Sequence, residues 1–160
     1  MLFSSSMFAD DISDFEIEGI SIGDSLLKYL DEDHIKEDID YSINELYNYK
    51  TEEFAEIFLH KKTKNYDLIS FIVTNDLDKK YIIHQINGRK KISISDCLEL
   101  KKKIVNDFRF MFPNAEVSES KFIPSFDDSG KSTIYYTYFI LHSNDEIAVE
   151  CYDYSEKISF

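Results

Sequence analysis

The run from Ser95 to Pro113 constrains the fold most, because it predicts one long amphipathic helix. Ser95 or Asp96 can cap the exposed N–H groups of the first turn, and Pro113 ends the helix. Apolar side chains recur on one stripe, namely Cys97, Ile104, Phe108 and Met111, widened by Leu100, Val105 and Phe112. The basic side chains, Lys101 to Lys103 and Arg109, are expected in water. We therefore predict a main helix over about residues 95–112 with one buried face.

The two cysteines, Cys97 and Cys151, are expected to form a structural disulfide. Cys97 lies on the apolar stripe of the main helix, and Cys151 shares a strand face with Ile147 and Val149. Both point into the same interior if the last hairpin covers the helix, and an even pair in an exported chain favours a bridge. Two alternatives stay open: two free core cysteines, or a reactive Cys97 thiol near a helix N-terminus.

Apolar and β-branched runs predict antiparallel hairpins on either side of this helix. Strands are expected over 66–74, 80–86, 132–142 and 146–154, and the segment 54–60, which also fits a helix, is assigned to a strand. Asn87-Gly88 is a two-residue turn signal leading to a short strand at 92–94, and 114–130 is expected to be a polar loop. Short helices are expected near 24–30 and over 33–40. The predicted fold class is α+β, an antiparallel sheet of about five to seven strands packed on the main helix.

A chain of 160 residues is long enough for one domain and short for two. Its opening, M-L-F-S-S-S-M-F-A, resembles the end of a secretory signal peptide with Ala9 at the cleavage position, although a basic region is missing. We therefore interpret 1–9 as a signal-peptide remnant and 10–160 as a single α+β domain, periplasmic or secreted. An ordinary frayed N-terminus is the alternative. No apolar run approaches the ~20 residues that span a bilayer.

The net charge of −13 is concentrated in the first third of the chain. Residues 1–56 contain 16 acidic and three basic side chains, which accounts for the whole excess. Such a chain repels phosphate backbones, so nucleic acid and anionic membranes are poor partners. One interpretation is a solvated acidic face lying over the basic cluster of Arg89 to Lys91 and Lys101 to Lys103. The other is a docking face for a cationic protein or ligand.

No motif for catalysis, a cofactor or a metal is found. Gly130-Lys131-Ser132-Thr133 resembles the end of a phosphate-binding loop, but position 125 is a serine and a strand follows, so a plain turn is expected. The four histidines, His34, His60, His84 and His142, lack the spacing of a metal site. The acidic run 31–40 lacks the glycine of a calcium loop, and no nucleophile has a recognisable setting.

The tyrosine-rich segment Y-Y-T-Y-F at 135–139 has two interpretations. It is either a ligand platform or the two faces of an ordinary strand. In the second case Tyr135 and Phe139 point inward with Tyr136 and Tyr138 at the edge, or the reverse.

Several motifs together resemble a family of small exported bacterial proteins with no assigned activity. They are F-E-I-E-G-I-S-I-G-D-S-L-L at 15–27, Y-I-I-H-Q-I-N-G at 81–88, D-C at 96–97, S-G-K-S-T at 129–133 and A-V-E-C-Y-D-Y-S at 148–155. The resemblance spans Asp10 to about Glu156. It implies export and the cysteine pair, and it carries no activity to this chain.

Two function hypotheses follow from the sequence. The first is a small exported, non-catalytic binding domain with an acidic N-terminal third, and the second is a hydrolase-like enzyme whose site is assembled from residues distant in sequence. A deep pocket with converging carboxylates or histidines would favour the enzyme. A flat acidic face over a packed interior would favour the binding domain.

Overall fold

The computed structural model describes residues 12, 15–41, 53–59, 63–75 and 80–155. The chain divides into two compact units, one formed from residues 13–91 and the other from residues 1–12 and 92–160. The predicted single domain over 10–160 stays a prediction, and residues 1–9 lie outside the described residues.

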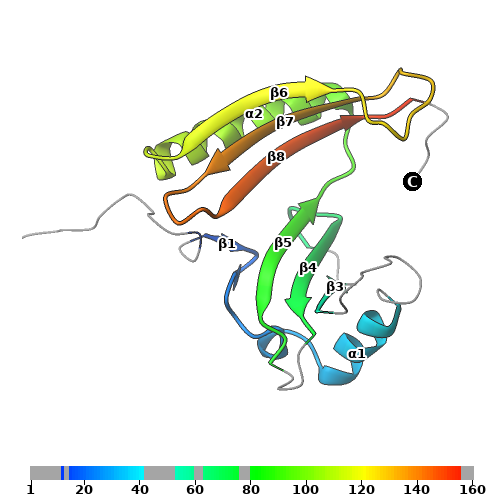
Figure 1. The fold of residues 1–160 in the computed structure, drawn as a ribbon, viewed down its shortest axis with the longest axis vertical. Coiled ribbons are helices and arrows are strands. Elements are labelled where there is room, and N and C mark those ends of the chain that lie inside the picture. The colour runs from blue at the N-terminus through cyan, green and yellow to red at the C-terminus, as the bar shows by residue number, and fades with distance from the viewer. Residues whose placement is uncertain (1–11, 13–14, 42–52, 60–62, 76–79, 156–160) are drawn as a thin grey trace, which may run out of the picture. The chain divides into compact units, whose positions relative to one another are not determined.

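The unit formed by residues 13–91 is built on a three-stranded antiparallel sheet (Figure 1). Its strands are β3 (Phe54–Leu59), β4 (Leu68–Thr74) and β5 (Ile83–Arg89), in the order β3-β4-β5. Before them come the small hairpin of β1 (Glu16–Ile17) and β2 (Ile20–Ser21), a 3-10 helix (Leu26–Lys28) and α1 (Glu32–Tyr41), which packs against β3. The fully buried centre of its core is Leu26, Ile35, Ala55, Ile57, Phe71, Val73 and Ile83.

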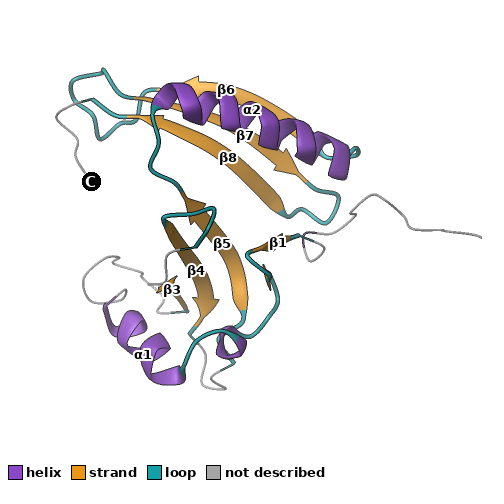
Figure 2. Ribbon diagram, turned by 180° about the vertical axis from the view of Figure 1, so that it is seen from behind, coloured by secondary structure: helices purple, strands orange, loops and turns teal. Residues whose placement is uncertain are grey.

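The second unit consists of one helix on one face of another three-stranded sheet. The helix α2 (Ile94–Met111) precedes β6 (Glu116–Phe122), β7 (Thr133–Ile140) and β8 (Glu146–Asp153), which pair in the order β6-β7-β8. Both Figure 1 and Figure 2 show α2 lying along one face of this sheet. Phe108 of α2 packs edge-on against Phe139 of β7, with ring centroids 5.7 Å apart.

The main helix is where the sequence places it, with a shifted N-cap. It begins after Ser93, whose hydroxyl accepts the Asp96 backbone N–H at 3.1 Å, so the cap is neither Ser95 nor Asp96. The bond expected between Cys97 and Cys151 is present, with S–S 2.09 Å and the Cα atoms 5.9 Å apart. It ties the first turn of α2 to β8.

The predicted single large sheet is wrong. The described residues form three small antiparallel sheets of two, three and three strands with only two α-helices, so the protein is mostly β. Between the two three-stranded sheets the chain passes from β5, which ends at Arg89, to α2, which begins at Ile94, and no described strand of one sheet pairs with a strand of the other. Each of those sheets is a meander built from local hairpins.

The hairpin predicted at Asn87-Gly88 is also wrong, because both residues lie within β5 and no strand forms at 92–94. A Cβ atom at Gly88 would lie 2.5 Å from the Tyr66 ring, so the ring occupies the space that a side chain would need. Glycine in a strand often marks such a close approach. At position 88 the glycine allows the Tyr66 ring to pack against the strand, and it does not form a turn.

The predicted polar loop at 114–130 contains an additional strand, β6. Most of its side chains are exposed, so hydropathy alone gives no strand pattern. Its partner is β7, with Val117 opposite Phe139 and Phe122 opposite Ile134. The tyrosine-rich β7 is therefore the central strand of its sheet.

We predict that Gly88→Ala lowers the free energy of unfolding by about 1–3 kcal/mol, the usual cost of overpacking. The cause is the clash with the Tyr66 ring, so the same substitution in a Tyr66→Ala background should cost much less. Urea denaturation of the four proteins in this double-mutant cycle measures the effect. An equal cost in both backgrounds would show that the ring is not the reason for glycine.

Candidate functional site

The β6-β7-β8 sheet has two chemically different sides, because successive side chains of a strand point to opposite faces. Phe139 contacts Phe108 of α2, and Cys151 is bonded to Cys97, so these positions lie on the helix side. The strand register assigns the alternate positions to the other side, which we call the open face and which Figure 1 views with α2 behind the strands. It comprises Glu116, Ser118, Ser120, Phe122, Ile134, Tyr136, Tyr138, Ile140, Glu146, Ala148, Glu150 and Tyr152. Apart from buried Ile134, these side chains are half-buried or exposed.

Aromatic rings cover the middle of the open face. Tyr136 and Tyr138 of β7 lie with ring centroids 5.0 Å apart, and Phe122 of β6 lies 5.7 Å from Tyr136. Tyr152 stacks on Tyr154 at 5.5 Å. Of the two arrangements open for 135–139, the structure has Phe139 inward and Tyr136 and Tyr138 on the other side.

Glu150 is held at the centre of this aromatic group. It lies opposite Tyr136 in the ladder, and its two carboxylate oxygens each accept a phenol hydroxyl. Tyr138 donates to Oε1 at 2.9 Å, and Tyr152 donates to Oε2. The hydrogen bond to Glu150, helped by partial burial, raises the pKa of Tyr138, because the phenol must stay protonated to donate. Three tyrosines thus surround one positioned carboxylate.

The open face is also strictly acidic. Its charged side chains are Glu116, Glu146 and Glu150, and no Lys or Arg occupies a strand position on it. In the part of the chain that the structure describes, none of these three carboxylates closes a salt bridge. The ligand-platform interpretation of 135–139 included Tyr136 and Tyr138, but the sequence did not predict the carboxylate of Glu150 beside them. The signal was present in E-x-A-x-E-x-Y at 146–152.

The helix side of the same sheet contains a buried lysine. Lys101 was expected in water, but it is 6% exposed, and its ammonium donates to the hydroxyl of fully buried Thr137. Its Nζ also lies 3.5 Å from the Glu119 carboxylate. Lys101 is one turn from Cys97 and one turn from buried Val105, so it lies on the inner stripe of α2. The prediction for this residue is wrong because its partners satisfy the buried charge.

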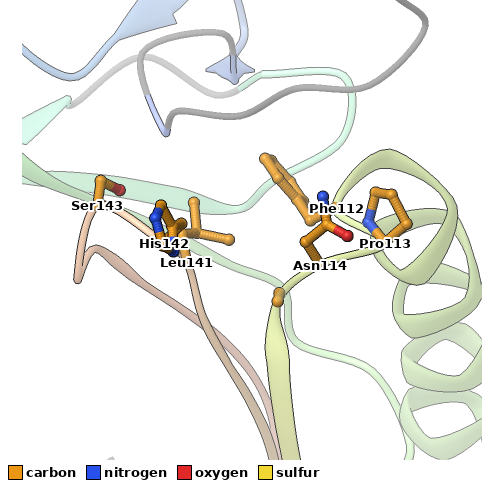
Figure 3. Close-up of a pocket in the computed structure, with 7 residues that line it drawn as sticks. Phe112, Pro113, Asn114, Leu141, His142 and Ser143 are labelled. Atoms are coloured by element: carbon orange, nitrogen blue, oxygen red, sulfur yellow. The ribbon is translucent and has the colours of Figure 1, made fainter.

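A pocket lies at one end of this unit (Figure 3). It has a volume of about 540 Å³ and is formed by the turn after α2 and the turn after β7. Its lining is Phe112, Pro113, Asn114, Ala115, Leu141, His142 and Ser143. The imidazole of His142 is the one titratable side chain among these seven, and no carboxylate accompanies it.

The remaining histidines and the acidic run have structural surroundings. His34 Nε2 lies 3.1 Å from the Phe58 carbonyl, and His84 contacts the Phe54 ring edge-on. His60 lies outside the described residues. Residues 32–41 form α1 rather than an ion-binding loop, and Asp38 accepts the Phe58 N–H at 2.7 Å. No group of three or more metal-ligating side chains occurs within the described ranges.

Part of the acidic excess and of the basic cluster is used in internal pairs. Arg89 lies 3.7 Å from the buried carboxylate of Glu56, and Lys103 lies 2.6 Å from Glu99. Lys28 pairs with Asp24. Asp24 also accepts the phenol hydroxyl of Tyr29, and this hydrogen bond raises the pKa of Tyr29 to about 12. Of these three pairs, only that of Arg89 with Glu56 joins an acid of the first third to the basic cluster, so the interpretation of an acidic face over this cluster stays a prediction.

The segment that resembles a phosphate-binding loop is a turn, as predicted. Asp127 organises it, accepting the backbone N–H groups of Ser129 at 2.9 Å and Ser132 at 2.7 Å, and the Ser129 hydroxyl at 2.6 Å. These hydrogen bonds, led by those from Ser129 and Ser132, hold the pKa of the Asp127 carboxyl well below its usual range. The strand β7 follows, so there is no helix N-terminus for a phosphate.

Comparison of the chain with protein-family models, with curated proteins and with solved structures finds no match. The resemblance to small exported proteins therefore stays a prediction. Among the described helices, none is long and apolar enough to cross a membrane.

We predict that Asp127→Asn destabilises the protein at neutral pH and much less in acid. A lowered folded-state pKa gives stability that is fully present above the ordinary carboxyl value of 3.8 and is lost as the pH falls toward the folded value. The gap between wild type and variant in urea midpoints should therefore shrink from about pH 6 to about pH 3. Asp128→Asn, the exposed neighbour, is the matched control. An equal gap at both pH values would contradict this role of Asp127.

Proposed function

We propose that the chain is a small non-catalytic binding domain that takes a cationic partner on the open face. The observation that carries the proposal is the combination on one face of three carboxylates without a salt bridge among the described residues, several aromatic rings and no basic side chain. A cation gains from both components, since carboxylates attract it and aromatic faces stabilise it through their quadrupole. An anionic partner would be repelled.

The shape of this face suits a macromolecular partner better than a small enclosed ligand. The rings lie on a sheet surface, and Phe122 and Tyr152 are each 47% exposed. Interfaces are enriched in tyrosine and phenylalanine. The acidic first third adds long-range attraction for a positively charged partner, which speeds encounter rather than tightening the final complex.

The arrangement gives less support to the hydrolase alternative. A hydrolase with paired carboxylates needs them about 5–10 Å apart around one substrate. Glu146 and Glu150 are four residues apart on one strand, which separates their backbone positions by about 13 Å. Glu116 and Glu146 both lie opposite Ile140, on the two strands beside it, which separates their backbone positions by about 10 Å, the upper limit of this range. Glu150 is engaged by two tyrosines, and the pocket beside His142 contains no carboxylate.

Export fits the same proposal. The disulfide between Cys97 and Cys151 is compatible with an oxidising compartment, where such bonds persist. We propose a periplasmic or secreted location, in which the partner is a cationic exported protein or ligand.

We predict that a short arginine- and lysine-containing peptide binds the protein, that an anionic peptide of equal length does not, and that affinity falls with salt. The double variant Glu146→Gln/Glu150→Gln should weaken binding about tenfold. The matched control is Asp33→Asn/Glu37→Gln, two exposed positions on α1, which changes the net charge equally. Isothermal titration at low and high ionic strength measures all three proteins. Equal weakening by both double variants, or binding insensitive to salt, would contradict the proposal.

A further inference from the structure

We infer that the open face recognises an arginine side chain of its partner, with the guanidinium bound to Glu150 and stacked on the surrounding tyrosines. This inference rests on the function proposed above and names the chemical group that the site selects. Charge complementarity is its first support, since Glu150 is a carboxylate on a face with no basic side chain at its strand positions.

The hydrogen bonding of Glu150 fits a guanidinium. A carboxylate has two oxygens with about four acceptor sites. One site on each oxygen is taken by a tyrosine hydroxyl, Tyr138 on Oε1 and Tyr152 on Oε2. An acceptor site therefore remains on each oxygen, and the two parallel N–H groups of arginine match such a pair. The tyrosines fix the carboxylate before binding, which reduces the ordering cost.

The neighbours of the tyrosines leave room for a planar group. Directly opposite Tyr138 in the two ladders are Ala148 and Ser118, and opposite Tyr136 on β6 is Ser120. All three are small and exposed. The large neighbours of the two rings are Phe122, 5.7 Å from Tyr136, and Glu150 itself. A guanidinium with its N–H groups on Glu150 would therefore stack on the side of the rings that Ser118 and Ala148 border.

Among the described residues, a cation–π contact lies on the other side of the sheet. Lys121 Nζ lies 6.0 Å from the centre of the Tyr135 ring, and both residues belong to the helix-side positions. Lys101 is likewise on the helix side. Neither of these two cations is placed to occupy the acceptor sites at Glu150.

Arginine fits these features better than lysine. Its guanidinium is planar and weakly hydrated, it stacks on aromatic rings, and its donors form a fixed fork. A lysine ammonium is a compact, strongly hydrated charge that cannot make the paired contact or stack. The geometry therefore favours arginine beyond the general attraction to any cation.

The test compares three seven-residue peptides with glycine at every other position and arginine, lysine or citrulline at the remaining ones. Binding is followed by NMR titration of the disulfide-bonded protein. Wild type should bind the arginine peptide about tenfold more tightly than the lysine peptide and should not bind the citrulline peptide measurably. Glu150→Gln should abolish the preference for arginine. Glu146→Gln removes the same charge at a position without a tyrosine hydroxyl and should keep the preference.

A second pair of variants leaves the hydrogen bonds of Glu150 untouched. Ala148→Lys adds a positive charge beside Tyr138 at an exposed position and should abolish binding, whereas Ala148→Gln, of similar length, should weaken it by less than about threefold. Equal affinity for the arginine and lysine peptides would contradict the inference of arginine recognition. It would not contradict the proposed binding of a cationic partner. Failure of both peptides to bind wild type would overturn the proposed function as well.

Discussion

The packing of α2 against one face of the β6-β7-β8 sheet is the contact on which this unit depends. A three-stranded sheet with a single helix can bury only one of its faces, so the helix side must supply most of the core. Phe108 against Phe139 forms its aromatic centre, and the disulfide between Cys97 and Cys151 anchors the start of the helix. Closing a loop with a sequence separation of 54 is worth about 4 kcal/mol in the chain-entropy model.

One consequence is that the opposite face is available for function. The same strands that place Cys151 and Phe139 against the helix place Glu150, Tyr136 and Tyr138 outward. Rigid strand backbones suit a binding surface, because its groups are positioned before the partner arrives. The hydrogen bonds from Tyr138 and Tyr152 to Glu150 extend this fixed geometry to the side chains.

Sequence reasoning succeeded where one strong periodicity dominates. Val105, Phe108 and Phe112 of the predicted helix stripe are buried, whereas Leu100 is exposed, so the stripe is narrower than predicted. The segment 54–60, which also fitted a helix, contains the strand β3 at Phe54–Leu59. The predictions were wrong where tertiary contacts determine the local structure or the burial of a residue. Tyr66 packs over Gly88, so Asn87-Gly88 lies inside a strand although its sequence is typical of a hairpin turn. Thr137 and Glu119 interact with the ammonium of Lys101, so this lysine can be buried.

The sequence predicted the candidate site only in part, since the possible ligand platform at 135–139 did not include Glu150, and the physical reason is a different one. Its residues alternate with core positions, so they carry no hydrophobic pattern, and Glu150 gains its setting only when β7 pairs with β8. The alternation of side chains along β7 places Tyr136 and Tyr138 on the face opposite Phe139. Sequence patterns that mark buried positions therefore predict the strands, but they do not predict which residues the sheet exposes together on its outer face.

The most direct test of this account is an intermolecular NOE experiment on the labelled protein with the unlabelled arginine peptide. We expect contacts from the arginine Cδ protons to the ring protons of Tyr136, Tyr138 and Tyr152, the rings around Glu150. Contacts confined to α1, or to α2 on the far side of the sheet, would show that the open face is not the binding surface.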